Sequence, residues 1–389
     1  MKIPKFRVGQ VVYTAPENIP MEDDGHNIEC TVLYPVIDGT YFLRVNDTDG
    51  FAIVPEEQLD GEVEMGNLDC DFTASRHRPS ILFFGNGTLA VPMLYALKSS
   101  GYDIKAVVTN KDKEHPTKHV PIRTPVRATA DKFGIPQIVA DDLHDKAFLA
   151  QLRSLGADLG IVVDYRLIPP SVFTIPPMGV INLHTSLLPA YRGSSTIASA
   201  IMNGEDHTGI TTIVIEKGVD KGKIINNLCV PIYPDDTHGD VLERVRDYGA
   251  TMLIDAIERR SRNLPTVFQT VVSNPFNKPS YAPKIFRQDS RINFTLPAAR
   301  IYDFIRALSP YPAAWMTQQV GAEAMTIKIF KAVMTEKVSQ QDNIGHLVRV
   351  GKELMLVCWD YMLKVYELQP QGRRRMTAEE FINGYGGKI

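Results

Sequence analysis

The stretch that decides the fold is Ile81-Leu82-Phe83-Phe84-Gly85-Asn86-Gly87-Thr88. Its four apolar residues form a continuous run, which is typical of a strand that is buried on both faces. The glycines that follow predict a tight turn into a helix that ends near Ser100, and residues 104–109 read as a second strand. A strand, a helix and a second strand in succession indicate a βαβ unit.

The same alternation continues downstream and sets the class of fold. Further buried strands are expected at 159–163 and 179–184. We also expect strands around 210–216 and 223–232, and helices over 194–203 and 239–262. Strands that alternate with helices build an α/β, doubly wound, mostly parallel, Rossmann-like sheet. We expect this central domain to span residues 80–264.

Two smaller β-rich domains are expected on either side of the central domain. Residues 1–60 carry short alternating runs with turns at Asp38-Gly39 and Asp49-Gly50, which predict an SH3-like β-barrel. Residues 61–79 and the proline-containing segment 265–290 read as linkers. Residues 291–389 begin with a helix and continue with strand-like runs, which predict a small C-terminal β-barrel. Thr377 and Glu380 have the spacing of a capping box at the start of a last helix.

The composition is that of an ordinary globular protein, with 44% hydrophobic and 22% charged residues in a chain of 389. No apolar run approaches the ~20 residues of a membrane span. No secretory signal opens the chain either, so we expect a cytoplasmic protein with no membrane partner. The four cysteines are scattered and lack metal-ligand spacing. A net charge of −3 gives no global attraction to nucleic acid, although basic residues cluster at 111–127 and 373–375.

Asn182 and His184 end one of the expected buried strands, and their spacing places both side chains on the same face. Burying such a polar pair is costly, so a catalytic role is favoured over a structural one. Asp220 lies in a glycine-flanked turn, where it is either an ordinary turn residue or a third member of the site. An amide, an imidazole and a carboxylate can together transfer an acyl group. One stabilises the oxyanion, one handles the amine proton and one orients the imidazole.

The glycine turn at 85–87 has two interpretations. It could bind a dinucleotide or a phosphate group, but the G-x-G-x-x-G spacing is broken by Ala90, and no acidic residue closes the next strand. A turn that lets a helix pack closely explains the residues better. Such a turn can still border a ligand, because ligands bind at the carboxyl ends of strands in these sheets.

Together these residues resemble those of the formyltetrahydrofolate-dependent formyltransferases. The resemblance is carried by Asn182-x-His184, by Ser186-Leu187-Leu188-Pro189-x-x-Arg192-Gly193 and by the Asp220 turn. It extends over residues 80–389. The segments 281–285, 305–315 and 368–376 are similar to the C-terminal domain of the members that act on methionyl-tRNA.

The resemblance implies that the chain transfers a formyl group from 10-formyltetrahydrofolate, its co-substrate, to the α-amino group of methionyl-tRNA for translation initiation, without a metal. It implies that 80–264 is the catalytic domain, that 291–389 is of the tRNA-binding type, and that Asn182, His184 and Asp220 are catalytic. The residues implied to bind folate are Tyr165, Arg166, Leu167, Ile168, Ser186, Leu187, Leu188 and Pro189. The residues expected to bind tRNA are Lys111, Lys113, Arg123, Arg192, Lys284, Arg373, Arg374 and Arg375.

The chain departs from the pattern of this family in several places. Residues 1–77 have no counterpart, the glycine turn differs, and the loop at 110–122 lacks the usual glycine- and arginine-rich sequence. Asp164 stands where a small apolar residue is common. One alternative is therefore a formyltransferase that acts on another amine, such as an amino sugar. A second alternative is an inactive homologue that uses the N-terminal barrel to recruit an unknown partner.

Overall fold

A computed structural model describes residues 11–14, 28–35, 40–45, 51–55, 59–60, 78–114, 121–272, 277–339, 341–387 and 389. The chain divides into two units. The first comprises Met1–Arg192, Gly209–Val230 and Arg244–Ser280, and the second comprises Gly193–Thr208, Pro231–Glu243 and Tyr281–Ile389.

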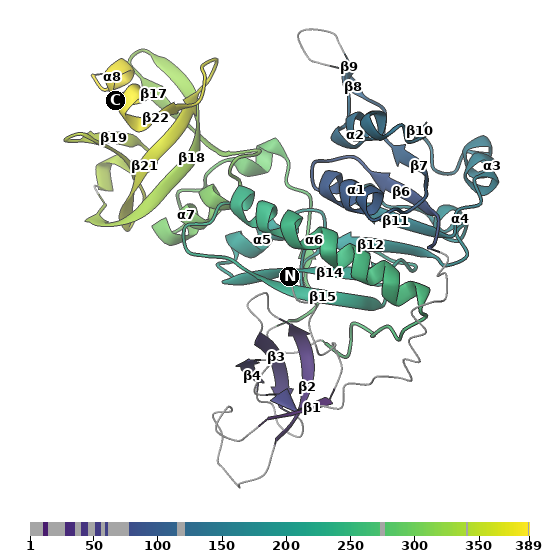
Figure 1. Ribbon diagram of the computed structural model, residues 1–389. Coiled ribbons are helices and arrows are strands. Elements are labelled where there is room, and N and C mark those ends of the chain that lie inside the picture. Colours follow the sequence, from purple (N-terminus) through teal and green to yellow (C-terminus); the bar gives the residue numbers. More distant parts are fainter. Residues whose placement is uncertain are drawn as a thin grey trace. The chain divides into compact units, whose positions relative to one another are not determined.

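The N-terminal segment contains five short strands in one antiparallel sheet, drawn in purple in Figure 1. Their order in the sheet is β4-β3-β2-β1-β5. The strands are β1 (Val11–Thr14), β2 (Ile28–Pro35), β3 (Thr40–Val45), β4 (Phe51–Pro55) and β5 (Leu59–Asp60). These strands are antiparallel, while their connecting loops and residues 61–77 of the expected linker lie outside the described residues, so the SH3-like barrel stays a prediction.

The first unit is built on a sheet of seven strands in the order β10-β7-β6-β11-β12-β14-β15. Neighbours from β10 to β12 pair in parallel, and β12 pairs with β14 antiparallel, so the sheet is mostly parallel as predicted. The strands are β6 (Ile81–Gly85), β7 (Ile104–Thr109), β10 (Gln137–Val139), β11 (Leu159–Val163), β12 (Val180–His184), β14 (His207–Val214) and β15 (Ile224–Pro231). Every residue of β6 is buried, which explains its uninterrupted apolar sequence.

Helices cover both faces of this sheet. Figure 1 shows α1 (Ala90–Ser99) and α6 (His238–Ser261) on the near face, where Met93 of α1 packs against Gly249 of α6. On the other face, α3 (Lys146–Ser154) and α4 (Pro170–Phe173) pack against the side chains of Leu82 and Phe84. The helix α2 (Pro125–Phe133) begins at Thr124, whose hydroxyl accepts a hydrogen bond from the Arg127 amide. The two-residue strands β8 (Lys113–Glu114) and β9 (Pro121–Ile122) pair beside the loop at 115–120.

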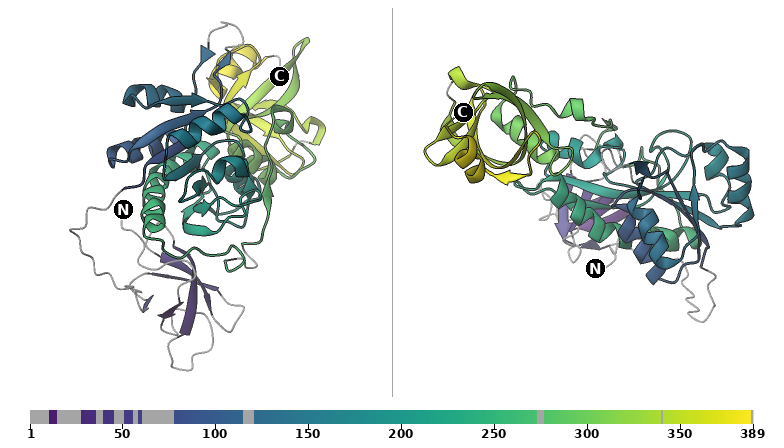
Figure 2. Two further views of the ribbon diagram at one scale, coloured as in Figure 1. Left: turned by 90° about the vertical axis from the view of Figure 1, so that its right-hand side faces the viewer. Right: turned by 90° about the horizontal axis from the view of Figure 1, so that it is seen from above.

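The second unit contains α5 (Thr196–Met202), α7 (Ala298–Ala307), the 3₁₀ turns η3 (Arg287–Ser290) and η4 (Gln341–Asn343), and a strongly curled antiparallel sheet. The sheet order is β17-β18-β21-β20-β19, with β22 beside β21. Its strands are β17 (Ala314–Val320), β18 (Glu323–Val338), β19 (Leu347–Val350), β20 (Glu353–Val357), β21 (Tyr361–Pro370) and β22 (Met376–Thr377). The right-hand view of Figure 2 shows the curl of this sheet end-on.

The expected C-terminal barrel is a half-barrel whose two edge strands are joined by a side chain. The buried Gln318 of β17 accepts a hydrogen bond from the Leu347 amide at 2.6 Å and donates one to its carbonyl oxygen at 2.9 Å. The sequence did not predict β17, because this glutamine occupies an inward position and breaks the apolar alternation. The last helix, α8 (Ala378–Tyr385), begins with the predicted capping box of Thr377 and Glu380.

Two short strands lie where the chain passes from the first unit into the second. They are β13 (Arg192–Gly193) and β16 (Tyr281–Ala282). Gly193 has a φ of 124°, and a side chain there would collide with the carbonyl oxygen of Ala282. The glycine after Arg192 is therefore required by this close backbone approach.

Candidate active site

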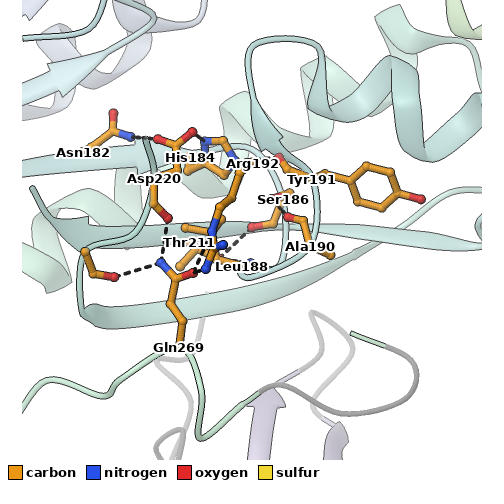
Figure 3. A network of polar contacts seen from close by, with 11 residues as sticks. Asn182, His184, Ser186, Leu188, Ala190, Tyr191, Arg192, Thr211, Asp220 and Gln269 are labelled. Carbon is orange, nitrogen blue, oxygen red and sulfur yellow. Dashed lines mark hydrogen bonds and ion pairs between the residues drawn. The ribbon is translucent and has the colours of Figure 1, made fainter. Parts of the chain in front are cut away.

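The catalytic residues expected from the sequence meet at the carboxyl end of β12. Leu183 points toward Gly249 of α6, so Asn182 and His184 lie on the opposite face of the strand. Asp220 reaches them from the loop between β14 and β15, where it adopts a φ of 49°. The Asn182 side-chain amide donates to Asp220 Oδ1 at 3.5 Å, and His184 Nδ1 lies 3.8 Å from Asp220 Oδ2, as Figure 3 shows.

A second contact fixes the orientation of the His184 ring. Its Nε2 atom lies 3.0 Å from the carbonyl oxygen of Tyr191. A carbonyl oxygen only accepts hydrogen bonds, so Nε2 carries a proton and donates it there. The Nδ1 atom therefore faces the Asp220 carboxylate, and a second proton on the ring would sit between the two groups. The buried ring is held from both sides, so it presents a fixed edge to a substrate.

Gln269 is a site residue that the sequence did not reveal. Its side-chain amide donates to the carbonyl oxygens of Asp220 at 2.7 Å and Gly222 at 2.9 Å. Its oxygen accepts from the Arg192 guanidinium at 2.6 Å, so one buried side chain joins the Asp220 turn to Arg192 (Figure 3). The proline-containing segment around it read as a linker, and a single glutamine there carries no periodic or charge signal.

The rest of that segment braces the loop after β12. Asn277 donates to the carbonyl oxygen of Leu188 at 3.2 Å, and Ser280 accepts from the Tyr191 amide at 2.8 Å. Asn277 also accepts a hydrogen bond from the Ala190 amide at 3.3 Å. Gln269, Asn277 and Ser280 of this expected linker are therefore bonded to the candidate site rather than lying apart from it.

The loop at 186–189, expected to bind folate, directs its side chains inward. The Ser186 hydroxyl donates to the Ala190 carbonyl oxygen at 2.7 Å, and Thr211 donates to the Ser186 carbonyl oxygen at 2.6 Å. Leu187, Leu188 and Pro189 are buried. These side chains shape the loop, and a contact with folate stays a prediction.

The loop after β11 offers groups that a ligand could use. The buried hydroxyl of Tyr165 and the Nε atom of Arg166 have no hydrogen-bond partner in the described part of the chain. The rest of the Arg166 guanidinium donates to the carbonyl oxygens of residues 140 and 141. Burial raises the pKa of the Tyr165 hydroxyl, and Arg166 opposes this effect. Leu167 is 71% exposed while Ile168 is buried, so the loop presents an apolar side chain beside unsatisfied polar atoms.

Four of the eight basic residues expected to bind tRNA have acidic partners. Lys111 pairs with Asp141, and Arg123 pairs with Asp131. Nearby, Arg127 pairs with Asp112 at 2.7 Å. The side chain of Lys113 lies outside the described residues.

The basic residues of the second unit differ among themselves. Arg374 pairs with Glu380, and Arg375 pairs with Glu367. For the Arg373 guanidinium, the described residues supply neither a hydrogen bond nor an ion pair, and the side chain is exposed. Lys284 places its ammonium 5.4 Å from the centre of the Phe286 ring. Of these expected tRNA-binding residues, Arg373 and Lys284 are therefore the two to which the described part of the chain supplies no acidic partner.

Among the described residues, no three His, Cys, Asp or Glu side chains gather in a way that could hold a metal ion. Within that same part of the chain, no helix is long and apolar enough to cross a membrane.

Comparison with known proteins places this site in a family. The family described as "Formyl transferase" matches residues 78–257, and "Formyl transferase, C-terminal domain" matches residues 284–386. The chain therefore belongs to the formyl transferase family.

Curated relatives within this family share one name. A "Methionyl-tRNA formyltransferase" of Porphyromonas gingivalis is 35% identical over 313 residues, which is 78% of this chain and 95% of that protein. The protein of the same name from Lysinibacillus sphaericus is 34% identical over 80% of this chain and 97% of its own length. The family match begins at residue 78, after the N-terminal sheet.

Solved structures support the fold. HypX from Aquifex aeolicus in complex with tetrahydrofolic acid has a TM-score of 0.53 at 16% identity, covering 79% of this chain and 47% of HypX. The chain thus spans about half the length of HypX. WlaRD, a sugar 3N-formyl transferase, has a TM-score of 0.52 at 20% identity, covering 77% of this chain and 100% of WlaRD.

Proposed function

We propose that this chain transfers the formyl group of 10-formyltetrahydrofolate to the α-amino group of methionyl-tRNA. The observation that carries the proposal is the convergence of Asn182, His184 and Asp220 at one strand end, in a chain that spans nearly the whole length of relatives with that activity in their name. All three groups suit acyl transfer to an amine, and two of them are fixed by further hydrogen bonds.

The proposed roles follow from the contacts. A neutral amine attacks the formyl carbon, and negative charge develops on the formyl oxygen. Asn182 supplies one N–H group for this oxygen at the carboxyl end of β12, and a His184 ring that carries its second proton on Nδ1 supplies another beside Asp220. Asp220 orients His184 through Nδ1, and it can take the amine proton through water. The Tyr191 carbonyl holds the far side of the ring, so the imidazole does not turn away during transfer.

The loop at 165–168 fits the pterin of the folate. A pterin edge carries both donors and acceptors, and this loop contains a buried tyrosine hydroxyl and an arginine N–H with unmet hydrogen-bonding capacity among the described residues. The exposed Leu167 can cover one face of the ring. Bound there, the folate would supply the formyl group, and the chain would supply its orientation.

We assign the tRNA contacts to Arg373 and Lys284 ahead of the paired residues. A cation without an acidic neighbour binds a phosphate more favourably, because it has no ion pair to break first. Arg192 is held by Gln269 beside the catalytic turn, so its proposed contact is with the aminoacyl end of the acceptor.

The N-terminal segment is proposed to be an SH3-like accessory barrel that recruits a partner and is not needed for the chemistry. The antiparallel order of its strands supports this proposal. A chain that begins near Arg78 should then keep most of its kcat/KM. A loss confined to the acceptor would instead make the barrel part of acceptor recognition.

The test of the proposed function is formyl transfer from 10-formyltetrahydrofolate with methionyl-tRNA and a panel of amino sugars offered in parallel. We expect transfer to methionyl-tRNA. Transfer to an amino sugar alone would support the alternative of a sugar formyltransferase. Transfer to no amine, with folate bound, would support the inactive homologue.

A further inference from the structure

Asp164 occupies a place in the sheet between the glycine turn and His184. It follows β11, and the strand order is β6-β11-β12, with Val163 in register with both Gly85 and Leu183. Neighbouring strands lie about 4.8 Å apart. A ligand that reaches from the glycine turn to His184 therefore passes over Asp164.

The backbone and the space around Asp164 are unusual. Its φ is 51°, a left-handed conformation that few residues other than glycine adopt. A Cβ atom at position 87 would lie 1.7 Å from Asp164 Oδ2, so the carboxylate fills the space of the missing Gly87 side chain. Such strained positions cluster at ligand sites, because their cost of about 1–3 kcal/mol persists only where the structure enforces it.

The charged and titratable groups on the elements around this carboxylate are Arg246, His184, Asp220 and Arg166. Arg246 of α6 acts on it through space, and the Arg246 guanidinium itself contacts the Thr88 hydroxyl. His184 lies on the neighbouring strand with Asp220 beyond it, and Arg166 is turned away toward the carbonyl oxygens of residues 140 and 141.

Among the described residues, the Asp164 carboxylate has neither a hydrogen-bond donor nor an ion-pair partner within bonding distance. It remains accessible at the surface, yet the surrounding protein withholds enough water to raise its pKa, and Arg246 opposes that rise. An accessible carboxylate with unused acceptor capacity suits a ligand that brings N–H groups or positive charge.

We propose that Asp164 receives the acceptor's amino group as its ammonium ion, pairs with it and takes one of its protons. This inference rests on the proposed function and names the group that prepares the acceptor. In the step, one N–H bond of the ammonium breaks and an O–H bond forms on the Asp164 carboxylate. The products are a neutral amine with a free lone pair and a neutral carboxyl group. The lone pair then attacks the formyl carbon beside His184.

The chemistry of the acceptor supports this pairing. An α-amino group has an ordinary pKa of about 7.7–8.0, so much of the acceptor arrives protonated at neutral pH and cannot attack. A carboxyl group with a raised pKa is a better proton acceptor than an exposed aspartate. The same negative charge would repel phosphate groups, so the phosphates of the acceptor must lie away from Asp164.

The experiment measures kcat/KM for methionyl-tRNA from about pH 6 to pH 9, for the whole chain and for Asp164→Asn. The variant should approach the unsubstituted chain near pH 9. Below the pKa of the amine it should lose about tenfold for each pH unit, because only acceptor that is already neutral reacts. The KM for 10-formyltetrahydrofolate should stay unchanged. Asp142→Asn, at an exposed aspartate of the same unit, serves as the matched control.

Gly87→Ala provides a second, independent test. The added methyl group should displace the carboxylate and produce the same acid-side loss, and it should cost little more when Asp164 is already alanine. Equal losses at all pH values would mean that Asp164 pairs with a hydroxyl group, and a raised KM for folate would place it on the donor side. Either result overturns the proposal. If the whole chain does not formylate methionyl-tRNA, the proposed function fails, and the profile on the amine that it does accept still decides the role of Asp164.

Discussion

Two sets of residues stand out in the sequence, the polar residues after β12 and the basic runs at 111–127 and 373–375, and the structure treats them differently. The side chains of Asn182 and His184 both lie beside the Asp220 carboxylate, and the Gln269 amide donates a hydrogen bond to the Asp220 carbonyl oxygen. In the basic runs, by contrast, most of the described cations pair individually with acids of the same unit.

The difference shows what fixes each kind of residue. Strand pairing determines which side chains lie at the carboxyl edge of a sheet. Asn182 and His184 share one face of one strand, so both come close to the loop that carries Asp220. A cation on the surface pairs with whatever acid the fold brings near, and that acid can be distant in sequence.

The largest effect is expected from removing either member of the His184–Asp220 pair. His184→Ala and Asp220→Ala should each lower kcat at least ~100-fold, because both groups act mainly in the transition state. Folate affinity should change little, and steady-state kinetics with a binding measurement separates the two quantities. A rise in KM without a loss of kcat would mean that these residues only bind substrate.

Gln269 should give a smaller but clear effect. Gln269→Leu leaves two carbonyl oxygens and a guanidinium without their partner, at a cost of about 1–3 kcal/mol, and should lower kcat roughly tenfold as the Asp220 turn loosens. Gln269→Glu keeps the Arg192 contact and removes the donors, so it should lose a similar amount. A variant with a lower Tm and an unchanged kcat would reduce Gln269 to a structural residue.

Arg373 should contribute more to the salt dependence of tRNA affinity than Arg374 or Arg375. Arg373→Gln should reduce the slope of log affinity against log salt by about one unit, the value for one lost phosphate contact. Arg374→Gln and Arg375→Gln should change the slope less, because each cation is already paired with a glutamate. Equal slopes for all three variants would show that the ion pairs open when tRNA binds.

The smallest effect is expected at the paired residues of the first unit. Lys111→Gln and Arg123→Gln should change the salt slope by much less than one unit, since exposed ion pairs already occupy both side chains. Their stability should also change little, because exposed ion pairs contribute only ~0–1 kcal/mol. A slope change as large as that of Arg373→Gln would show that the 111–127 cluster contacts tRNA after all.

Much of the fold could be predicted from the sequence, because apolar periodicity reports burial directly. The uninterrupted run in β6 and the capping box at Thr377 are examples, and both are confirmed. The strand β17 was missed because Gln318 points inward and closes the half-barrel through its amide. An inward polar residue gives no apolar signal, and its partner Leu347 is distant in the chain.

The part of the candidate site that lies on a strand was predictable too, because the alternation along a strand fixes the direction of each side chain. The pair on β12 could be placed from the alternation of one strand, whereas Gln269 could not, because its three contacts depend on how a loop far along the chain folds back. The inward direction of Ser186 and Leu188 was equally hidden. Loop side chains have no periodicity from which a facing direction can be inferred.

The most direct test of the central claim is the kcat of the double variant His184→Ala/Asp220→Ala, measured beside both single variants in formyl transfer to methionyl-tRNA. If the two residues act as one unit, the double variant should lose about as much activity as the single variant with the lower kcat. If the losses multiply instead, the residues act independently, and the catalytic arrangement at the end of β12 is contradicted.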